Sequence, residues 1–531
     1  MSAASSSPVA VATVAPAEHA RTPATPARAH TYGQILKSSA LIGGSSVINI
    51  AVSIVRAKAM ALMLGPAGVG LVGLYSSIMN LGHSIAGMGV NSSGVRQIAE
   101  AVGSGDTHRI ALTTAVLRRT SLVLGLLGAA MLIVFCRPVS VWTFGTPDYA
   151  GQVALLSATL LFMSISDGQA ALIQGMRRIS DLARIGVISA VLGSASSLLL
   201  VYFFLDKGVV PSLVGAAAIM VGISWWYRRK IEIQPASITA AQTRAEAGAL
   251  LTLGSAFMAS AVLTTGAAYA VRIIVRDGFG LGAAGLYQSA WALGGLYVGF
   301  ILQAMGSDFY PRLTAVVNDH EECNRLVNEQ AQVSLLLAGP GVVGTLTFAP
   351  LVIALFYDAR FGGAVQPLRW ICLGMALRVI AWPMGFIIVA KGARSLFFWT
   401  EVAATVVHVG LAWILVKPFG LDGATMAFFG LYIWHGLLVY AIVRRMTGFC
   451  WSQGNLQTAA VMLPLIGVVF CGFLLLPMWA ATTLGILMSL VSGVYSLRVL
   501  CHLVPLDRLP RAVREMLEWL RISPPLEPEA S

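Results

Sequence analysis

Apolar residues run along this chain in long segments that short polar stretches separate. An α-helix needs about 20 mostly apolar residues to cross the hydrocarbon core of a membrane. About 14 segments have this length, so the pattern predicts an all-α polytopic membrane protein. The segments are 39–63, 69–94, 115–136, 152–175, 185–205, 209–227, 248–273, 281–306, 331–356, 367–390, 395–416, 420–442, 458–476 and 479–503.

A repeated pattern divides these segments into two sets. The tripeptide Gly73-Leu74-Tyr75 recurs as Gly285-Leu286-Tyr287, within a similar series of apolar segments. Chance alone also produces short matches in chains rich in Gly and Leu, but the surrounding segments repeat as well. Internal repeats are common in membrane transporters. We therefore predict two six-helix bundles, over 31–230 and 245–445, followed by two additional spans over 458–503.

The two ends of the chain are polar. Residues 1–30 are rich in Ala, Pro, Ser and Thr and show no hydrophobic period, which predicts a disordered tail. Within 504–531, Leu509, Val513 and Leu520 share one helical face, and arginines lie off that face. Such an amphipathic helix either lies on an anionic cytoplasmic leaflet or binds a partner protein.

Composition supports the membrane assignment. The chain is 57% hydrophobic and only 11% charged, whereas soluble domains carry about 25% charged residues. No loop between spans is long, and the longest lies near 307–330. A soluble catalytic domain has no room, so we predict no enzyme activity, no catalytic residue and no cofactor. The six cysteines lack the close spacing of a zinc or redox pair, which predicts no metal site.

The net charge of +12 does not indicate nucleic-acid binding, because the basic residues sit in short clusters between apolar segments. Most of the 35 Lys and Arg residues lie in the two tails and in the loops that follow even-numbered segments. The other set of loops contains Arg137, Lys207, Arg360 and Lys417. Cytoplasmic loops carry an excess of Lys and Arg, so both termini are predicted to be cytoplasmic.

Several basic residues lie inside the predicted spans, where a charge usually faces a cavity or a partner. Arg56 and Arg378 lie near the middle of their spans, and Lys58 is close to Arg56. Arg272 lies at the outer end of its span, where the alternative is that its guanidinium reaches the membrane interface. Together with Lys391, these residues predict a net-positive cavity for an anionic group such as phosphate.

Acidic and imidazole groups are fewer within the spans. Asp167 and Glu401 are candidates for coupling transport to an ion, and Asp167 could equally pair with an arginine or bond to backbone. His83, His408 and His435 lie within spans and are interpreted as hydrogen-bonded packing residues.

Several motifs carry a family resemblance. Val55-Arg56-Ala57-Lys58 and the following stretch 64–70 resemble the opening spans of polysaccharide lipid-carrier flippases, which include O-antigen and enterobacterial-common-antigen translocases. Tyr310-Pro311-Arg312-Leu313, Leu377-Arg378 and the stretch 389–402 are similar to later parts of the same group, within the multidrug/oligosaccharidyl-lipid/polysaccharide exporter superfamily. The likeness covers about 33–445 and leaves out the N-terminal tail and the last two spans.

The resemblance implies two bundles around a central cavity that opens alternately to either side of the bacterial inner membrane. The implied substrate is an undecaprenyl-pyrophosphate-linked oligosaccharide, and polysaccharide polymerase and chain-length proteins are implied partners. Lys58, Arg378 and Lys391 occupy basic positions that match the family. Two alternatives remain: a multidrug or cation efflux transporter of related fold, and a polytopic glycan polymerase or ligase. Efflux of cations favours an acidic cavity, and the enzymes need a sizeable outward loop or paired acids.

Overall fold

The computed structural model describes residues 26–233 and 239–503, and its regular elements in those ranges are all helical. Residues 1–25 of the predicted tail 1–30 and the whole predicted tail 504–531 lie outside the described residues. The helices are α1 (Pro26–Ala86), α2 (Val90–Ser104), α3 (Thr107–Val134), α4 (Cys136–Phe144), η1 (Pro147–Tyr149), α5 (Ala150–Gly175), α6 (Ile179–Phe204), η2 (Leu205–Gly208), α7 (Val209–Arg228), α8 (Ala240–Ala315), α9 (His320–Thr347), α10 (Ala349–Phe356), η3 (Ala359–Ala364), α11 (Val365–Ala390), α12 (Arg394–Thr447), α13 (Gln453–Leu475) and α14 (Met478–Leu503).

Among the described residues, nine helical segments are long and apolar enough to cross a membrane, or up to ten if the bent pair α9 and α10 forms one span. Four of the nine contain 42 to 54 residues, about twice the length that one crossing needs. Three of these four are broken at Gly65, Gly280 and Gly420, and the fourth at η2. The polytopic all-α class is therefore confirmed, while the number of 14 spans stays a prediction.

The break in α1 has a direct chemical cause. Gly65 adopts φ 65°, a left-handed conformation that favours glycine, and Pro66 follows it. Proline has no N–H to donate to the carbonyl four residues earlier, which is Leu62. The chain therefore turns at Gly65, between the first two predicted spans.

The predicted span 331–356 is not one continuous helix. The chain bends by 81° between α9 and α10. Pro350 lies in the first turn of α10 and cannot donate to the carbonyl of Leu346. The apolar pattern alone did not predict this bend, because most residues on both sides of it are apolar.

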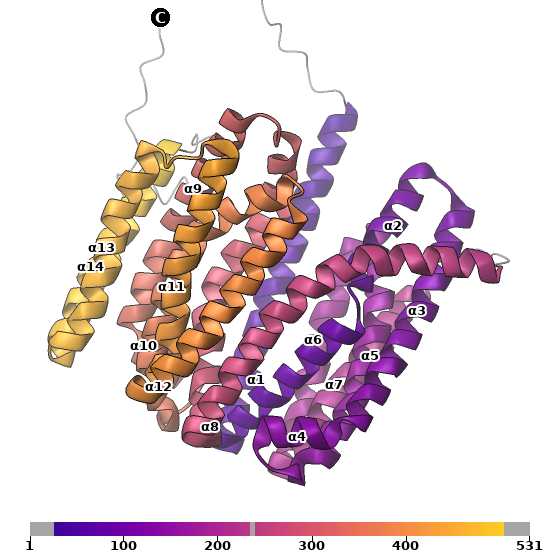
Figure 1. Ribbon diagram of the computed structural model, residues 1–531, viewed down its shortest axis with the longest axis horizontal. Helices are drawn as coiled ribbons and strands as arrows, with labels where there is room; N and C mark the ends of the chain where they lie inside the picture. The colour runs from indigo at the N-terminus through magenta and orange to yellow at the C-terminus, as the bar shows by residue number, and fades with distance from the viewer. Residues whose placement is uncertain (1–25, 234–238, 504–531) are drawn as a thin grey trace, which may run out of the picture.

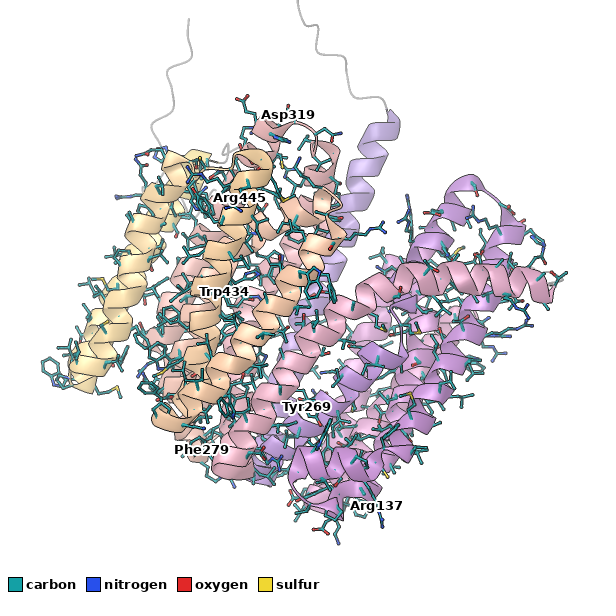
Figure 2. The ribbon with its side chains drawn as sticks, in the orientation of Figure 1. Arg137, Tyr269, Phe279, Asp319, Trp434 and Arg445 are labelled. Atoms are coloured by element: carbon teal, nitrogen blue, oxygen red, sulfur yellow. The ribbon has the colours of Figure 1, made fainter. Side chains whose placement is uncertain are left out.

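Helices α2–α7 gather in one bundle and α9–α12 in another, with α1 and α8 between them (Figure 1). The α13–α14 hairpin lies on the outer flank of the second bundle, against α9. Figure 2 places Arg137 and Phe279 at one end of the molecule and Asp319 and Arg445 at the opposite end. We call these the Arg137 end and the Arg445 end. The arrangement agrees with the two predicted sets of loops, and the domain limits 31–230 and 245–445 stay predictions.

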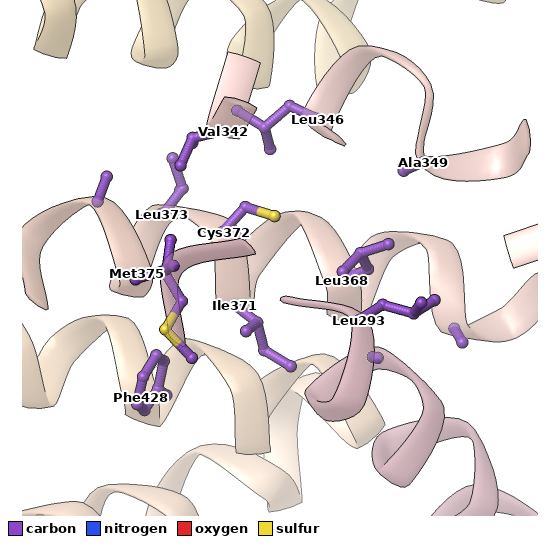
Figure 3. Close-up of a cluster of buried hydrophobic side chains, with 14 of the residues drawn as sticks. Leu293, Val342, Leu346, Ala349, Leu368, Ile371, Cys372, Leu373, Met375 and Phe428 are labelled. Atoms are coloured by element: carbon purple, nitrogen blue, oxygen red, sulfur yellow. The ribbon is translucent and has the colours of Figure 1, made fainter. Parts of the chain in front are cut away.

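The largest hydrophobic core of the described residues lies where α8, α9, α11 and α12 meet (Figure 3). Leu293, Ile371 and Met375 are buried there, together with Phe428. This packing fixes α11 between its neighbours. Because α11 is fixed on this side, the side chains on its opposite face are also held in a defined position.

The two copies of the repeated tripeptide occupy similar environments. Tyr75 in α1 is 0% exposed and Tyr287 in α8 is 1% exposed. Ser77 and Ser289, which follow each copy, are also buried and donate to backbone carbonyls of their own helices. The repeat therefore marks equivalent buried positions in α1 and α8.

Candidate functional site

A cavity of about 370 Å³ lies between α8, α11 and α12. Its walls come from one side of each helix, and most of the lining is apolar or aromatic. We call it the α11–α12 cavity. Its lining residues are Ser260, Thr264, Ala267, Ala268, Trp291, Arg378, Ala381, Trp382, Gly385, Phe386, Val389, Phe397, Glu401, Ala404, Thr405, His408, Phe428, Leu431, Tyr432 and His435.

Helical periodicity explains why these residues share a wall. Residues three or four positions apart lie on the same face of an α-helix. On α11 the spacing joins Arg378 to Trp382, and on α12 it joins Tyr432 to His435. Glu401 and His408 are seven positions apart on the first part of α12. Each helix therefore presents one stripe of side chains to the cavity.

Arg378 is held in the cavity by aromatic rings. The centre of its guanidinium lies 4.6 Å from the centroid of the Trp382 ring and 5.8 Å from that of Tyr432. Such contacts contribute about 0.5–1 kcal/mol at exposed sites and more where water is excluded. Its buried Nε has no hydrogen-bond partner among the described residues.

The cavity also contains a carboxylate. Glu401 lines it together with Arg378, and so do His408 and His435. With neutral imidazoles, the formal charges of the lining cancel. Glu401 thus faces the same space as Arg378, and the predicted net-positive cavity for an anion stays a prediction.

Of the residues predicted from sequence, the cavity brings Arg378 and Glu401 together. The other predicted residues are not among its lining. The side chain of Arg56, on α1, is exposed on the protein surface. The structure records no hydrogen bond or ion pair for Arg56 with the described residues.

Lys58 and Arg360 join α1 to the second bundle at the Arg137 end. The Lys58 ammonium donates to the carbonyls of Ala354 and Tyr357, which lie at the end of α10. Arg360 donates to the carbonyl of Leu62, at 2.9 Å, and to that of Ala61. The Leu62 carbonyl is the one that Pro66 leaves without its helical donor. Both cations therefore satisfy carbonyls at helix ends or breaks. We call these contacts the α1 latch.

A similar contact joins α8 to the first bundle. Arg276 donates to the carbonyl of Trp142 in α4, at 2.7 Å, and pairs with Asp277. Thr143 of α4 also bonds to Tyr269 of α8. At the Arg137 end, hydrogen bonds therefore join α1 to the second bundle and α8 to the first.

Arg272 and Lys391 also have protein partners. Arg272 donates from Nε to the side-chain oxygen of Gln288 and from Nη1 to the carbonyl of Ala268, both at 2.9 Å. Both partners belong to α8, so Arg272 bridges the two arms of that helix. Lys391 contacts the carbonyl of Val317 and the ring of His320 near the Arg445 end.

Asp167 pairs with a histidine and not with an arginine. Its carboxylate lies 2.8 Å from Nε2 of His83, and the two residues border a small polar pocket in the first bundle. Ser121 and Ser164 line the same pocket. Nδ1 of His83 has no hydrogen-bond partner among the described residues. His83 is therefore hydrogen-bonded, as interpreted from the sequence, and its partner is the carboxylate of Asp167.

The sequence reasoning did not single out the aromatic part of the cavity. Trp382 and Tyr432 lie beside Arg378, and Trp291 lines the same cavity. The usable signal for Trp382 was its position four residues after Arg378, on the same helical face. Trp291 and Tyr432 come from other helices, so no local spacing relates them to Arg378.

The buried Arg369 was also missed. It is 4% exposed, donates to the Leu346 carbonyl that Pro350 leaves free, and stacks on the ring of Phe473 in α13 at 3.7 Å. This residue stabilises the bend between α9 and α10. Its contact with Phe473 also anchors the α13–α14 hairpin to the second bundle.

The two bundles and the helices between them define a multi-pass membrane protein with a known transporter fold. The fold matches an inward-facing multidrug resistance MATE family transporter of the MOP superfamily, with TM-score 0.62, 18% identity and coverage of 76% of this chain and 98% of that one. It also matches the lipid II flippase MurJ in an inward closed conformation, with TM-score 0.64, 14% identity and coverage of 88% and 99%.

Residues 59–366 match the family described as polysaccharide biosynthesis protein, and the chain belongs to this family. The chain is also 22% identical, over 412 residues, to proteins named lipid III flippase from Escherichia coli (strain K12) and Shigella flexneri. The aligned part covers 75% of this chain and 95% of each relative. These matches confirm the resemblance that was predicted from the motifs.

Proposed function

We propose that this protein is a flippase for an undecaprenyl-pyrophosphate-linked oligosaccharide. It moves this lipid from the cytoplasmic to the periplasmic leaflet of the bacterial inner membrane by alternating access, for the synthesis of O-antigen, exopolysaccharide or a similar surface polysaccharide. The observation that carries the proposal is the α11–α12 cavity, which places polar groups and aromatic rings inside a membrane-spanning fold.

The relatives support the class of activity. The two curated relatives are named lipid III flippases, and one structural neighbour is a lipid II flippase. The predicted short loops favour a transporter without catalysis. The family description favours a role in the synthesis of polysaccharides.

Alternating access requires that contacts at one end break while contacts form at the other. The α1 latch and the Arg276 contact are made of hydrogen bonds from cations to backbone carbonyls. Such bonds exchange readily for bonds to water or to an anion. These contacts are therefore suited to close the Arg137 end in one state and to release it in the other. We assign the Arg137 end to the periplasm, with both termini cytoplasmic.

The predicted cationic residues keep a proposed role in binding the substrate. Arg56 has no ion-pair partner recorded among the described residues, so it is the first candidate for the pyrophosphate, whereas Arg378 shares its cavity with Glu401. Lys58, Arg272 and Lys391 would have to leave their present partners before they bind a substrate. Asp167, paired with His83, and Glu401, in the cavity, are the proposed ion-coupling groups. Polysaccharide polymerase and chain-length proteins remain proposed partners.

A second candidate is efflux of an organic cation. Glu401 lies among aromatic rings, an arrangement that suits a cation, and a multidrug transporter shares the fold. Arg378 in the same cavity opposes a cation, which is why the flippase is preferred.

Deletion of the gene tests both candidates. Loss of the flippase should leave one undecaprenyl-linked glycan on the cytoplasmic leaflet and reduce surface polysaccharide, with recovery when the gene returns on a plasmid. Analysis of lipid-linked intermediates by mass spectrometry measures this result. Unchanged intermediates together with new sensitivity to cationic drugs would favour efflux instead.

A further inference from the structure

We infer that the α11–α12 cavity is a subsite for an uncharged sugar ring of the glycan, and that it does not hold the pyrophosphate. The inference rests on the proposed function and specifies the part of the substrate that this cavity recognises. It departs from the sequence-based expectation, which assigned Arg378 to an anionic group. Three features carry it: unpartnered polar atoms, aromatic faces and balanced charge.

Three buried polar atoms of residues that line the cavity have no hydrogen-bond partner among the described residues. They are Nε of Arg378, Nε2 of His408 and Nδ1 of His435. A buried polar atom without a hydrogen-bond partner is unfavourable, because it has lost its bonds to water. The side chains that carry these atoms come from two different helices and line one cavity, so rotation of each side chain toward a ligand with several hydrogen-bonding groups would give these atoms partners. A sugar ring has such groups around its rim.

The walls between these atoms are aromatic. Trp382 lies beside Arg378 on α11, and Tyr432 lies beside His435 on α12. Trp291 and Phe428, with ring centroids 4.9 Å apart, also line the cavity. A pyranose carries C–H groups on its two faces and hydroxyls on its edge. Flat apolar walls with a few placed polar groups are the usual design of a small-molecule site.

The charge of the lining excludes strongly charged groups. Arg378 and Glu401 face the same cavity and cancel formally. A pyrophosphate would place its negative charges near the Glu401 carboxylate in a medium of low dielectric constant, where like charges repel strongly. A neutral acetamido sugar avoids this repulsion. Its carbonyl accepts a hydrogen bond from Arg378, and its hydroxyls donate to Glu401.

The volume agrees with a small part of the substrate. At about 370 Å³ the cavity lies near the lower end of small-molecule sites, which measure about 300–1,000 Å³. That space takes one or two sugar rings. The lipid and the pyrophosphate would then lie outside this cavity, nearer to other cations such as Arg56.

Ligand-detected NMR with the full-length protein in nanodiscs tests this inference. The probes are methyl 2-acetamido-2-deoxy-glucoside, methyl glucuronide and sodium pyrophosphate. We expect saturation transfer to the acetamido glycoside. Neither pyrophosphate nor the glucuronide should reduce that signal. Trp382→Ala should weaken glycoside binding about tenfold, equivalent to about 1.4 kcal/mol, and Trp382→Phe should retain part of it.

Trp399→Ala is the matched control, because Trp399 lies on α12 but is 63% exposed and does not line the cavity. Glu401→Gln removes the negative charge and should allow the glucuronide to bind. Displacement of the glycoside by pyrophosphate or by the glucuronide in the unmodified protein would overturn the inference. So would equal glycoside binding by Trp382→Ala and Trp399→Ala.

Flipping of an undecaprenyl-pyrophosphate-linked glycan by the same protein in proteoliposomes separates this inference from the proposed function. Flipping without glycoside binding rejects the sugar subsite and retains the flippase. Glycoside binding with no flipping of any lipid-linked glycan, and normal lipid intermediates in the deletion strain, rejects the flippase and leaves a sugar site.

Discussion

Gly70 of α1 and Gly285 of α8 pack backbone against backbone. A Cβ atom on Gly285 would lie 1.8 Å from the carbonyl oxygen of Pro66, and one on Gly70 would lie 2.2 Å from that of Leu281. Gly285 begins the second copy of the repeated tripeptide. Gly73, which begins the first copy, faces the side chain of Gln288 in α8, so both copies lie along the contact between α1 and α8. Small residues allow such contact between membrane helices.

The first prediction concerns this contact. Gly285→Ala should destabilise the protein by about 1–3 kcal/mol, the usual cost of overpacking, because the methyl group meets backbone that cannot rotate away. Thermal unfolding in nanodiscs measures the change. Gly299→Ala, on the same helix with no atom within 4 Å of the added Cβ, is the control. Equal midpoints for the two variants would show that α1 and α8 separate at little cost.

The second prediction concerns the α1 latch. Arg360→Met removes the donors to Ala61 and Leu62 while keeping an extended apolar side chain. Ala61 is 0% exposed, so a cysteine placed there should be protected from a membrane-impermeant maleimide. We expect labelling of Ala61→Cys, in a background without the native cysteines, to rise several-fold when Arg360→Met is added.

Arg137→Met provides the control for this experiment. Arg137 is an exposed arginine at the same end of the molecule, and no bond from it to the described residues is recorded. Labelling of Ala61→Cys that rises equally in both backgrounds would reflect general loosening. That result would contradict a specific role of Arg360 in closing the Arg137 end.

The third prediction concerns Arg56 and Arg378. Replacing either residue by alanine should lower glycan export while the protein inserts at normal abundance, because each supplies a group for the proposed substrate. Lysine should restore part of the export, since charge returns without the planar guanidinium. Glutamate should be worse than alanine. Export assays in a deletion strain, with immunoblots for abundance, provide the measurement. Wild-type export by both alanine variants would reject these assignments.

The fourth prediction concerns orientation. Introduced cysteines should react from outside the cell at the Arg137 end and only after permeabilisation at the Arg445 end. The expected outside positions are Asp148, Lys207, Lys417 and Pro477, and the expected inside positions are Asp106, Arg229 and Arg444. Labelling of positions 229 and 207 from the same side of the membrane would contradict the predicted alternation of spans, because α7 separates Arg229 from Lys207.

The helical class could be predicted from sequence because the need to bury apolar surface in lipid acts on each segment by itself. The same local logic identified Arg378 and Glu401, since a charge within an apolar run is visible without knowledge of its neighbours. Helical spacing also connected Arg378 with Trp382. For these features the sequence contained the necessary information within one helix.

The partners of the charged groups were decided only by tertiary structure. Lys58 binds Ala354 and Tyr357, which lie almost 300 positions away in the chain, and Asp167 meets His83 across two helices. Such contacts depend on how the helices pack, and packing depends on the shapes of many side chains at once. The balanced charge of the cavity has the same origin, because α11 and α12 bring an arginine and a carboxylate from separate spans to one space.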